Sequence, residues 1–321
     1  MLRAALEDLA PVSAAIDAAL ARGRCVAPTH IGEPLGVLHG AEQAFRELGL
    51  FLHIRASVDL CEGRPREALE SILDQIRFAA MLRRDARAVG IGALATEIER
   101  RGWRDLRALT QLESFDASAT DRALEVCLPL IESLETRIEP TLRTEYTWIR
   151  QRILDQPGVA GLKPHRTIER LGEFFREAIR DQAIPAARRR PVGAGRNGAL
   201  DAFTGNRRGD GYLKLATSIH KMLLTERPIC QFERRGTILL LALRSSHDRH
   251  EVLPESLEAL VPDILASVPI DPYSGEPMRY DPTKGWVWSI GSDGIDSGGD
   301  PSPFPNRPQE LEPTLEVAPR G

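Results

Sequence analysis

The stretch from Cys61 to Leu82 reads CEGRPREALESILDQIRFAAML, and it decides the class of the fold. Gly63 is of the type that commonly ends a helix, and Pro65 is of the type that favours the first turn of the next one. After Pro65, apolar residues recur at the spacing of a helix that buries one face: Leu69, Ile72, Leu73, Ile76 and Leu82. The stretch therefore predicts a helical hairpin.

Apolar residues keep this helical spacing on both sides of the hairpin. Residues 41–58 carry the stripe before it, and residues 86–101 carry a later stripe that we expect to end at Gly102. Gly, Pro and His are frequent over residues 22–40, and this composition predicts a loop. Strand-like alternation of useful length is absent from this part of the sequence. We therefore expect an α-helical hairpin domain over residues 1–185.

Residues 186–211 change character, because they are rich in Gly and Arg and poor in apolar side chains. This composition predicts a linker. Helical spacing returns at Tyr212, with an expected break at Pro228, where proline cannot continue the helical hydrogen bonding. The most apolar run of the chain, Gly236–Arg244, follows this proline and suits a buried helix.

The pattern after this run predicts a small antiparallel sheet. A short helix over residues 253–265 precedes two strand-like segments, 278–280 and 286–290, which we expect to form a hairpin. Trp286 and Trp288 lie on one face of the second strand, because side chains alternate along a strand. We expect this tryptophan face to cover the apolar helix.

Two further segments complete the organisation. We expect an α+β domain over residues 212–300 and, because residues 301–321 are rich in Pro and Glu, a disordered tail after it. The expected fold class is therefore mainly α, with a helical-hairpin domain followed by a small α+β domain that carries a short antiparallel sheet.

The composition excludes several classes of function. The 321 residues are 42% hydrophobic and 27% charged, with a formal net charge of −4. Such a chain has no overall basic field, so we expect no nucleic-acid partner. No apolar stretch is long enough to span a bilayer, and the N-terminus lacks a signal-peptide core.

Four cysteines lie far apart in the sequence: Cys25, Cys61, Cys127 and Cys230. Because none forms a CxxC pair, a zinc knuckle or a thioredoxin-type motif is not supported. We expect small buried apolar residues, and the sequence leaves one disulfide open without choosing its pairing.

Residues 193–198, GAGRNG, match the letters of a dinucleotide-binding loop. Such a loop lies between a strand and a helix, but residues 188–191, RRRP, precede it here, so a flexible linker is favoured. Residues 208–210 spell the adhesion tripeptide RGD, which a linker of this composition contains by chance.

His247 to Glu251 reads HDRHE and brings two imidazoles near a carboxylate. In the zincin pattern the two histidines are one helical turn apart, with the glutamate between them. Here the histidines are three residues apart and Glu251 follows them, so the polar end of a helix is favoured. We predict no catalytic residues and no organic cofactor. The alternative is an enzyme of unknown reaction with an inter-domain site near His247 and His250.

The last apolar strand runs into a loop of Asp, Ser and Gly, WVWSIGSDGIDSGGD, from Trp286 to Asp300. Calcium prefers six or more oxygen ligands, and Asp293, Asp296 and Asp300 are candidate ligands. The neighbouring glycines let backbone carbonyls turn toward a cation. The spacing is not that of an EF-hand, and the residues by themselves favour an ordinary turn.

Two motifs stand out in the last third of the chain. Residues 271–280, DPYSGEPMRY, match a D-P-aromatic-x-G-x-P-x-x-Y segment, and residues 289–294, SIGSDG, match an S-x-G-x-D-G segment. With the apolar helix before them, these motifs resemble the C-terminal part of the major pseudopilin of type II secretion systems. In that family the helix packs on a small antiparallel sheet, and the second motif opens a calcium-binding loop. The resemblance implies calcium at Asp293, Asp296 and Asp300.

The rest of the chain departs from that family. A pseudopilin begins with a short basic leader and a long apolar helix that crosses the membrane and polymerises; this chain shows neither, so filament assembly is not expected. The layout is similar to a class of uncharacterised bacterial proteins, in which a helical-hairpin region precedes a detached pseudopilin-like module. An N-terminal membrane anchor is common in that class. We therefore expect the periplasmic side of the cell envelope if the native protein has an anchor, and the cytoplasm otherwise.

Together these features predict a non-enzymatic binding or assembly protein of the bacterial cell envelope, related to secretion and pilus-type systems. Stacked helical hairpins form concave surfaces that bind partners. The small module would serve as a rigid interaction head, stiffened by calcium, for a protein partner that the sequence does not identify.

Overall fold

The computed structural model describes residues 10–23, 35–86, 89–134, 138–189, 205–299 and 314–317, except for the side chains of 35–41, 132–134 and 222–224. The described chain is mainly helical with one small antiparallel sheet, as the sequence predicts, and this sheet has three strands. The helices are α2 (Ala10–Ala21), α3 (Leu35–Cys61), α4 (Pro65–Asp85), α5 (Val89–Thr110), α6 (Ala117–Leu134), α7 (Glu139–Leu154), α8 (Pro164–Arg180) and α10 (Arg207–His250). Among the described residues, none of these helices is both long and apolar enough to cross a membrane.

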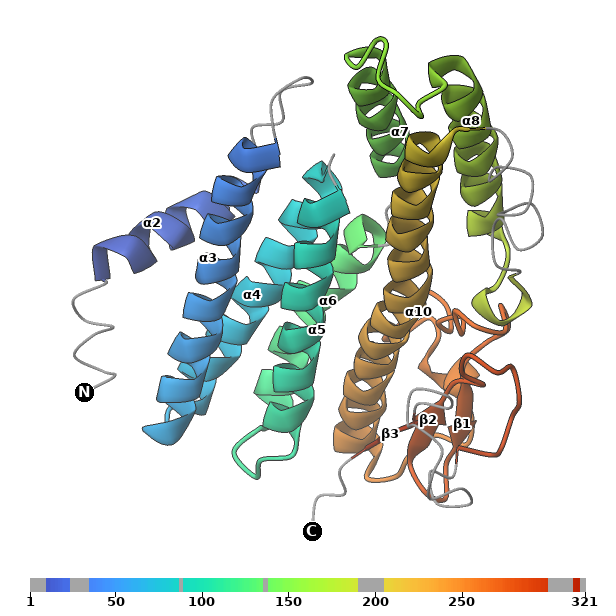
Figure 1. Ribbon diagram of the computed structural model, residues 1–321. Coiled ribbons are helices and arrows are strands. Elements are labelled where there is room, and N and C mark those ends of the chain that lie inside the picture. The colour runs from blue at the N-terminus through green and yellow to red at the C-terminus, as the bar shows by residue number, and fades with distance from the viewer. Residues whose placement is uncertain are drawn as a thin grey trace.

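The long helix α10 joins three parts of the molecule (Figure 1). Along one side it packs against α5 and α6, which belong to a layer that continues through α4 to α3. Near its N-terminal end α10 meets the hairpin of α7 and α8, and near its C-terminal end it meets the sheet. One hydrophobic core runs from α4, α5 and α6 across α10 to the sheet.

The predicted helical hairpin is confirmed. α3 ends at Cys61 and α4 begins at Pro65, which occupies the first turn of the helix. Between them Gly63 has φ 71°, a left-handed conformation that glycine adopts without steric cost. The helix that follows buries the predicted stripe of Leu69, Ile72 and Leu73 in the core.

The expected helix end at Gly102 is wrong, because α5 continues through it to Thr110. Gly102 lies where α4 and α5 approach each other, and a Cβ atom added there would be 2.8 Å from Ile76 Cγ1. Glycine is therefore needed for close packing between two helices and not for a turn. The expected loop over residues 22–40 is also wrong in part, because α3 begins at Leu35.

The predicted break at Pro228 is wrong as well, because α10 runs through this proline from Arg207 to His250. A single proline removes one hydrogen bond from a helix, and here packing against α5, α6 and α8 holds the helix on both sides of it. The linker predicted over residues 186–211 is wrong at both ends, and residues 190–204 lie outside the described residues. Residues 207–211 are helical, and Ala186–Arg188 form the 3-10 turn η2.

Three short strands form the sheet, in the order β1 (Arg279–Asp281), β2 (Trp286–Trp288) and β3 (Thr314–Glu316). The β1–β2 hairpin was predicted, and its register places Tyr280 opposite Val287. The third strand was not predicted, so the expectation of a disordered tail over residues 301–321 is wrong for residues 314–316. Leu315 explains this pairing, because it reaches the surface of α10 at Gly236.

The face of the sheet that packs on α10 is the opposite of the one expected. Tyr280, Val287 and Leu315 form the inner row, and Val287 is fully buried. Trp286 and Trp288 lie on the outer face and are partly exposed. The helix expected over residues 253–265 is likewise reduced to the single 3-10 turn η3 (Leu257–Leu260).

A buried ion cluster fastens α10 to the helical layer. Glu99 of α5 is fully buried, and its carboxylate lies 2.5 Å from Arg83 Nη2 of α4 and 3.3 Å from Arg234 Nε of α10. The indole of Trp103 donates a third contact to the same carboxylate, at 3.1 Å. Burial alone would raise the pKa of Glu99, but the two arginines outweigh it and hold the pKa below its usual value.

Removing the charge of Glu99 should strongly destabilise the protein, because Glu99→Gln leaves two arginines next to a neutral amide in the core. We expect the free energy of unfolding to fall by about 3–5 kcal/mol. Urea denaturation followed by circular dichroism measures this loss.

Glu97→Gln is the matched control, since Glu97 lies on the same helix with its side chain 44% exposed and ion-paired to Arg46 and Arg101. We expect a loss below about 1 kcal/mol for this variant. Equal losses in the two variants would contradict a central role for Glu99.

The low folded-state pKa of Glu99 also makes stability depend on pH. The charged carboxylate stabilises the folded wild type at a pH above the unfolded-state pKa of about 4.3, and this stabilisation is lost as the pH falls through the folded-state pKa.

Candidate functional site

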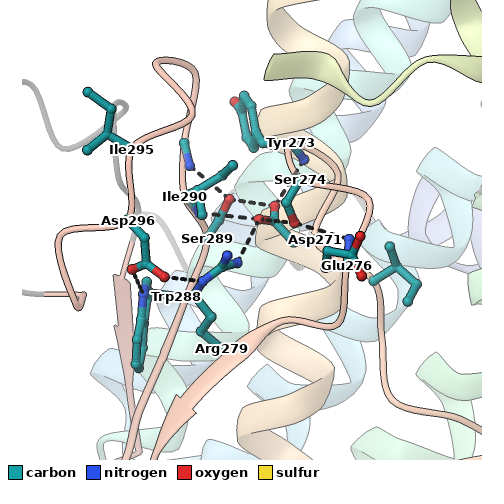
Figure 2. A network of polar contacts seen from close by, with 12 residues as sticks. Asp271, Tyr273, Ser274, Glu276, Arg279, Trp288, Ser289, Ile290, Ile295 and Asp296 are labelled. Atoms are coloured by element: carbon teal, nitrogen blue, oxygen red, sulfur yellow. Dashed lines mark hydrogen bonds and ion pairs between the residues drawn. The ribbon is translucent and has the colours of Figure 1, made fainter. Parts of the chain in front are cut away.

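The side chain of Asp271 is the centre of a polar network in the C-terminal module, residues 251–299 and 314–317, and it is fully buried in the turn that precedes β1 (Figure 2). Its backbone starts a tight turn, in which Asp271 N donates to Glu276 O at 2.7 Å and Gly275 N donates to Asp271 O at 2.9 Å. Gly275 has φ 79°, which a residue with a side chain rarely adopts. The sequence Asp-Pro-Tyr-Ser-Gly therefore folds locally into a loop that points the carboxylate inward.

Four hydrogen bonds satisfy this carboxylate. Within its own turn, Tyr273 N and Ser274 Oγ donate to it at 3.0 Å each. From the strand end after β2, Ser289 Oγ donates at 2.6 Å and Ile290 N donates at 3.2 Å. Both carboxylate oxygens accept hydrogen bonds and neither is exposed to solvent. The arrangement therefore favours a structural role for Asp271 over acid–base chemistry.

These contacts join the two motifs that the sequence singled out. Residues 271–280 supply the carboxylate, and residues 289–294 supply the serine and the amide that bind it (Figure 2). Ser289 Oγ also accepts a hydrogen bond from Gly291 N at 3.1 Å, which turns the chain into the Asp-rich loop. Neither Asp271 nor Ser289 was predicted as a site residue, and only the motif letters marked them.

The start of the predicted linker also packs against this turn. Ala186 N donates to Pro272 O at 3.0 Å, and Ala187 N donates to Tyr273 O at 3.2 Å. Pro185 lies so close to Gly275 that an added Cβ would be 2.8 Å from Pro185 Cγ. The backbone that leaves α8 is therefore held by the same loop that carries Asp271.

Arg279 of β1 lies between two carboxylates. Its Nη1 is 3.6 Å from Asp271 Oδ2, and its Nε donates a short hydrogen bond to Asp296 Oδ2. The other oxygen of Asp296 accepts from Trp288 Nε1 at 3.0 Å and from Gly298 N at 3.1 Å. Partial burial would raise the pKa of Asp296, but the bonds from Trp288, Gly298 and Arg279 outweigh it and hold the pKa below its usual value.

The three predicted calcium ligands differ in their surroundings. Asp293 is exposed, and its Oδ1 accepts from Ile295 N at 3.2 Å, as in an ordinary turn. Asp296 is held by Arg279 and Trp288, and Asp300 lies outside the described residues. Within the part of the chain that the structure describes, no three His, Cys, Asp or Glu side chains form a metal-holding group. In the described conformation the side-chain oxygens of Asp293 and Asp296 accept N–H groups of the protein, and calcium at these residues stays a prediction from the sequence.

The two histidines of the alternative enzyme hypothesis lie at the end of α10. His247 lines a cavity of about 440 Å³ between α10 and the sheet, together with Asp248 and Lys284. His250 is exposed and does not line this cavity. The cavity therefore includes only one of the two imidazoles.

The remaining sequence motifs have structural roles or lie outside the described residues. Residues 193–198, GAGRNG, are outside the described residues. The RGD tripeptide forms the first turn of α10, where Asp210 Oδ1 is 3.2 Å from Arg170 Nη1. Cys127 and Cys230 are buried free thiols and Cys61 is an exposed one, while Cys25 lies outside the described residues.

Comparisons of the chain with protein-family models, with curated proteins and with solved structures found no match in any of the three.

Asp271→Asn should destabilise the module, because an amide has one oxygen and would direct its own N–H groups at donors that the carboxylate now satisfies. We expect a loss of about 2–4 kcal/mol in the free energy of unfolding, measured by urea denaturation. Asp263→Asn is the control, since Asp263 is exposed in the same module and should lose nothing measurable. A loss for Asp271→Asn as small as that of the control would show that this carboxylate does not hold the loops together.

Proposed function

We propose that the chain is a non-enzymatic binding or assembly protein in which the C-terminal module is the interaction head. The observation that carries this proposal is the outer face of the sheet, where Trp286 and Trp288 lie away from the core. The resemblance of residues 236–300 to a pseudopilin supports a setting in the bacterial cell envelope, in a secretion or pilus-type system.

The register of the sheet defines this outer face. Arg279, Trp288 and Thr314 form one row across the three strands, and Asp281, Trp286 and Glu316 form the next. Lys284 covers the ring of Trp286, with its Nζ 4.3 Å from the ring centre. Tryptophan and arginine are enriched in protein–protein interfaces, and this face carries two tryptophans and Arg279.

The loop beside this face adds an exposed apolar side chain. Ile295 is 60% exposed, and Figure 2 shows it directed away from the polar network. Asp293 and Asp296, on either side of it, accept hydrogen bonds within the loop from Ile295 N and Gly298 N. An apolar side chain on a held loop loses little conformational entropy on binding, which favours a role as a contact residue.

The inner face explains why this head is rigid. Tyr280, Val287 and Leu315 pack with the apolar side chains of α10, and Tyr280 Oη donates to Pro254 O at 3.1 Å. A sheet of three short strands is stable only when such a surface covers one face. The helical layer, through α10, therefore supports the proposed contact surface.

A photo-reactive amino acid placed at Ile295 in the full chain tests this proposal in native cells. We expect one discrete covalent adduct with a partner protein, because this side chain lies on the proposed contact surface. The adduct should disappear when excess unlabelled wild-type chain is present, and it should persist with excess Ile295→Asp chain.

The same photo-reactive residue at Leu112 is the matched control, because Leu112 is 40% exposed but lies at the corner between α5 and α6. We expect no such adduct there. Absence of an adduct at position 295, or an identical adduct at both positions, would contradict the assignment of the sheet face as the interaction head.

A further inference from the structure

The loop that follows β2 is in contact with a positive charge of the protein itself, the guanidinium of Arg279 in β1. Asp271 and Asp296 come from different loops, and the guanidinium of Arg279 lies between them (Figure 2). Arg279 is the neighbour of Trp288 in the register of β1 and β2. The sheet therefore fixes the position from which this cation reaches both carboxylates.

The contacts of Asp296 show what the cation does. One oxygen receives the Nε–H of Arg279, and the other receives N–H groups from Trp288 and Gly298. A carboxylate that binds calcium must direct its oxygens at the metal. In the described conformation two N–H donors occupy one oxygen and the guanidinium of Arg279 lies at the other, so the positive charge of Arg279 opposes a metal ion that approaches Asp296.

Contacts next to the ion pair of Arg279 and Asp296 also fix the end of this loop against the sheet. Gly299 lies against the indole of Trp288, where an added Cβ would be 2.7 Å from Cδ2. Gly299 O accepts from Thr314 Oγ1 of β3 at 2.7 Å. The ion pair of Arg279 and Asp296 thus lies inside a loop that β2 and β3 hold at both ends.

We propose that Arg279 is the resident cation of residues 289–299 and that it holds this loop closed without a metal ion. An exposed ion pair contributes little by itself. Arg279 differs, because it also faces the buried carboxylate of Asp271 and because its partner Asp296 is fixed by an indole. Calcium and Arg279 then compete for Asp296, and this inference does not depend on which partner the protein binds.

Two variants test this competition in the full chain, with calcium chloride and with EDTA as the probes. Arg279→Gln removes the cation and should lower the Tm by at least about 3 °C. It should also create a Tm increase in millimolar calcium, because Asp271 and Asp296, which both face Arg279 in the wild type, then lack a cation between them. Lys284→Gln is the control for lost charge, since Lys284 covers Trp286 on the same sheet, and it should create no response to calcium.

The indole N–H resonance of Trp288, assigned with Trp288→Phe, reports on the loop itself by NMR. In the wild type we expect this resonance and the Tm to be the same in calcium and in EDTA. In Arg279→Gln the resonance should move and should respond to calcium, while the circular dichroism of the helices stays native. The inference is overturned if calcium raises the wild-type Tm and moves its Trp288 resonance. It is also overturned if Arg279→Gln leaves both unchanged in EDTA.

Discussion

The buried carboxylate of Glu99 is the constraint on which the arrangement of the helices depends. Two arginines from different helices, Arg83 and Arg234, approach this single carboxylate in the interior, and Trp103 donates to it as well. Such a cluster is stable only when every member is in place, since one missing partner leaves a buried charge uncompensated. It therefore fixes the rotation and the height of α10 against α4 and α5 in a way that apolar packing alone does not.

The helix α10 contacts the helical layer on one side and the sheet on the other. On the side of the helical layer, the guanidinium of Arg244 lies over the ring of Phe115 and donates to the backbone carbonyls of Thr110 and Phe115, at the corner between α5 and α6. Gly236 on α10 leaves room for Leu315 of β3. Helical layer, α10 and sheet thus share one core, and Asp271 then orders the loops above that core.

The sequence predicts the features that depend on local chemistry. The hairpin around Gly63 was predictable because its turn signals lie side by side, and the β1–β2 hairpin was predictable for the same reason. The role of Gly102 was predicted wrongly because this glycine allows a close contact with another helix, which the local sequence does not reveal. The strand β3 was not predicted because its place depends on the contact of Leu315 with Gly236 of α10, which is distant in the sequence. Alternation along β2 separated two faces but did not tell which one faces the core. Within the site, the motif letters marked Asp271, while its contact with Ser289 and the pairing of Arg279 depend on the folded chain.

The most direct test of this account is whether the sheet and the helical layer unfold together. Fluorinated tryptophan provides separate ¹⁹F NMR signals for Trp103, in the helical layer, and Trp288, in the sheet. Because both parts share one core through α10, we expect the two signals to lose their native positions at the same urea concentration. If the Trp288 signal loses its native position at a lower urea concentration while the Trp103 signal keeps it, the module is an independent domain and does not share one cooperative core with the helices.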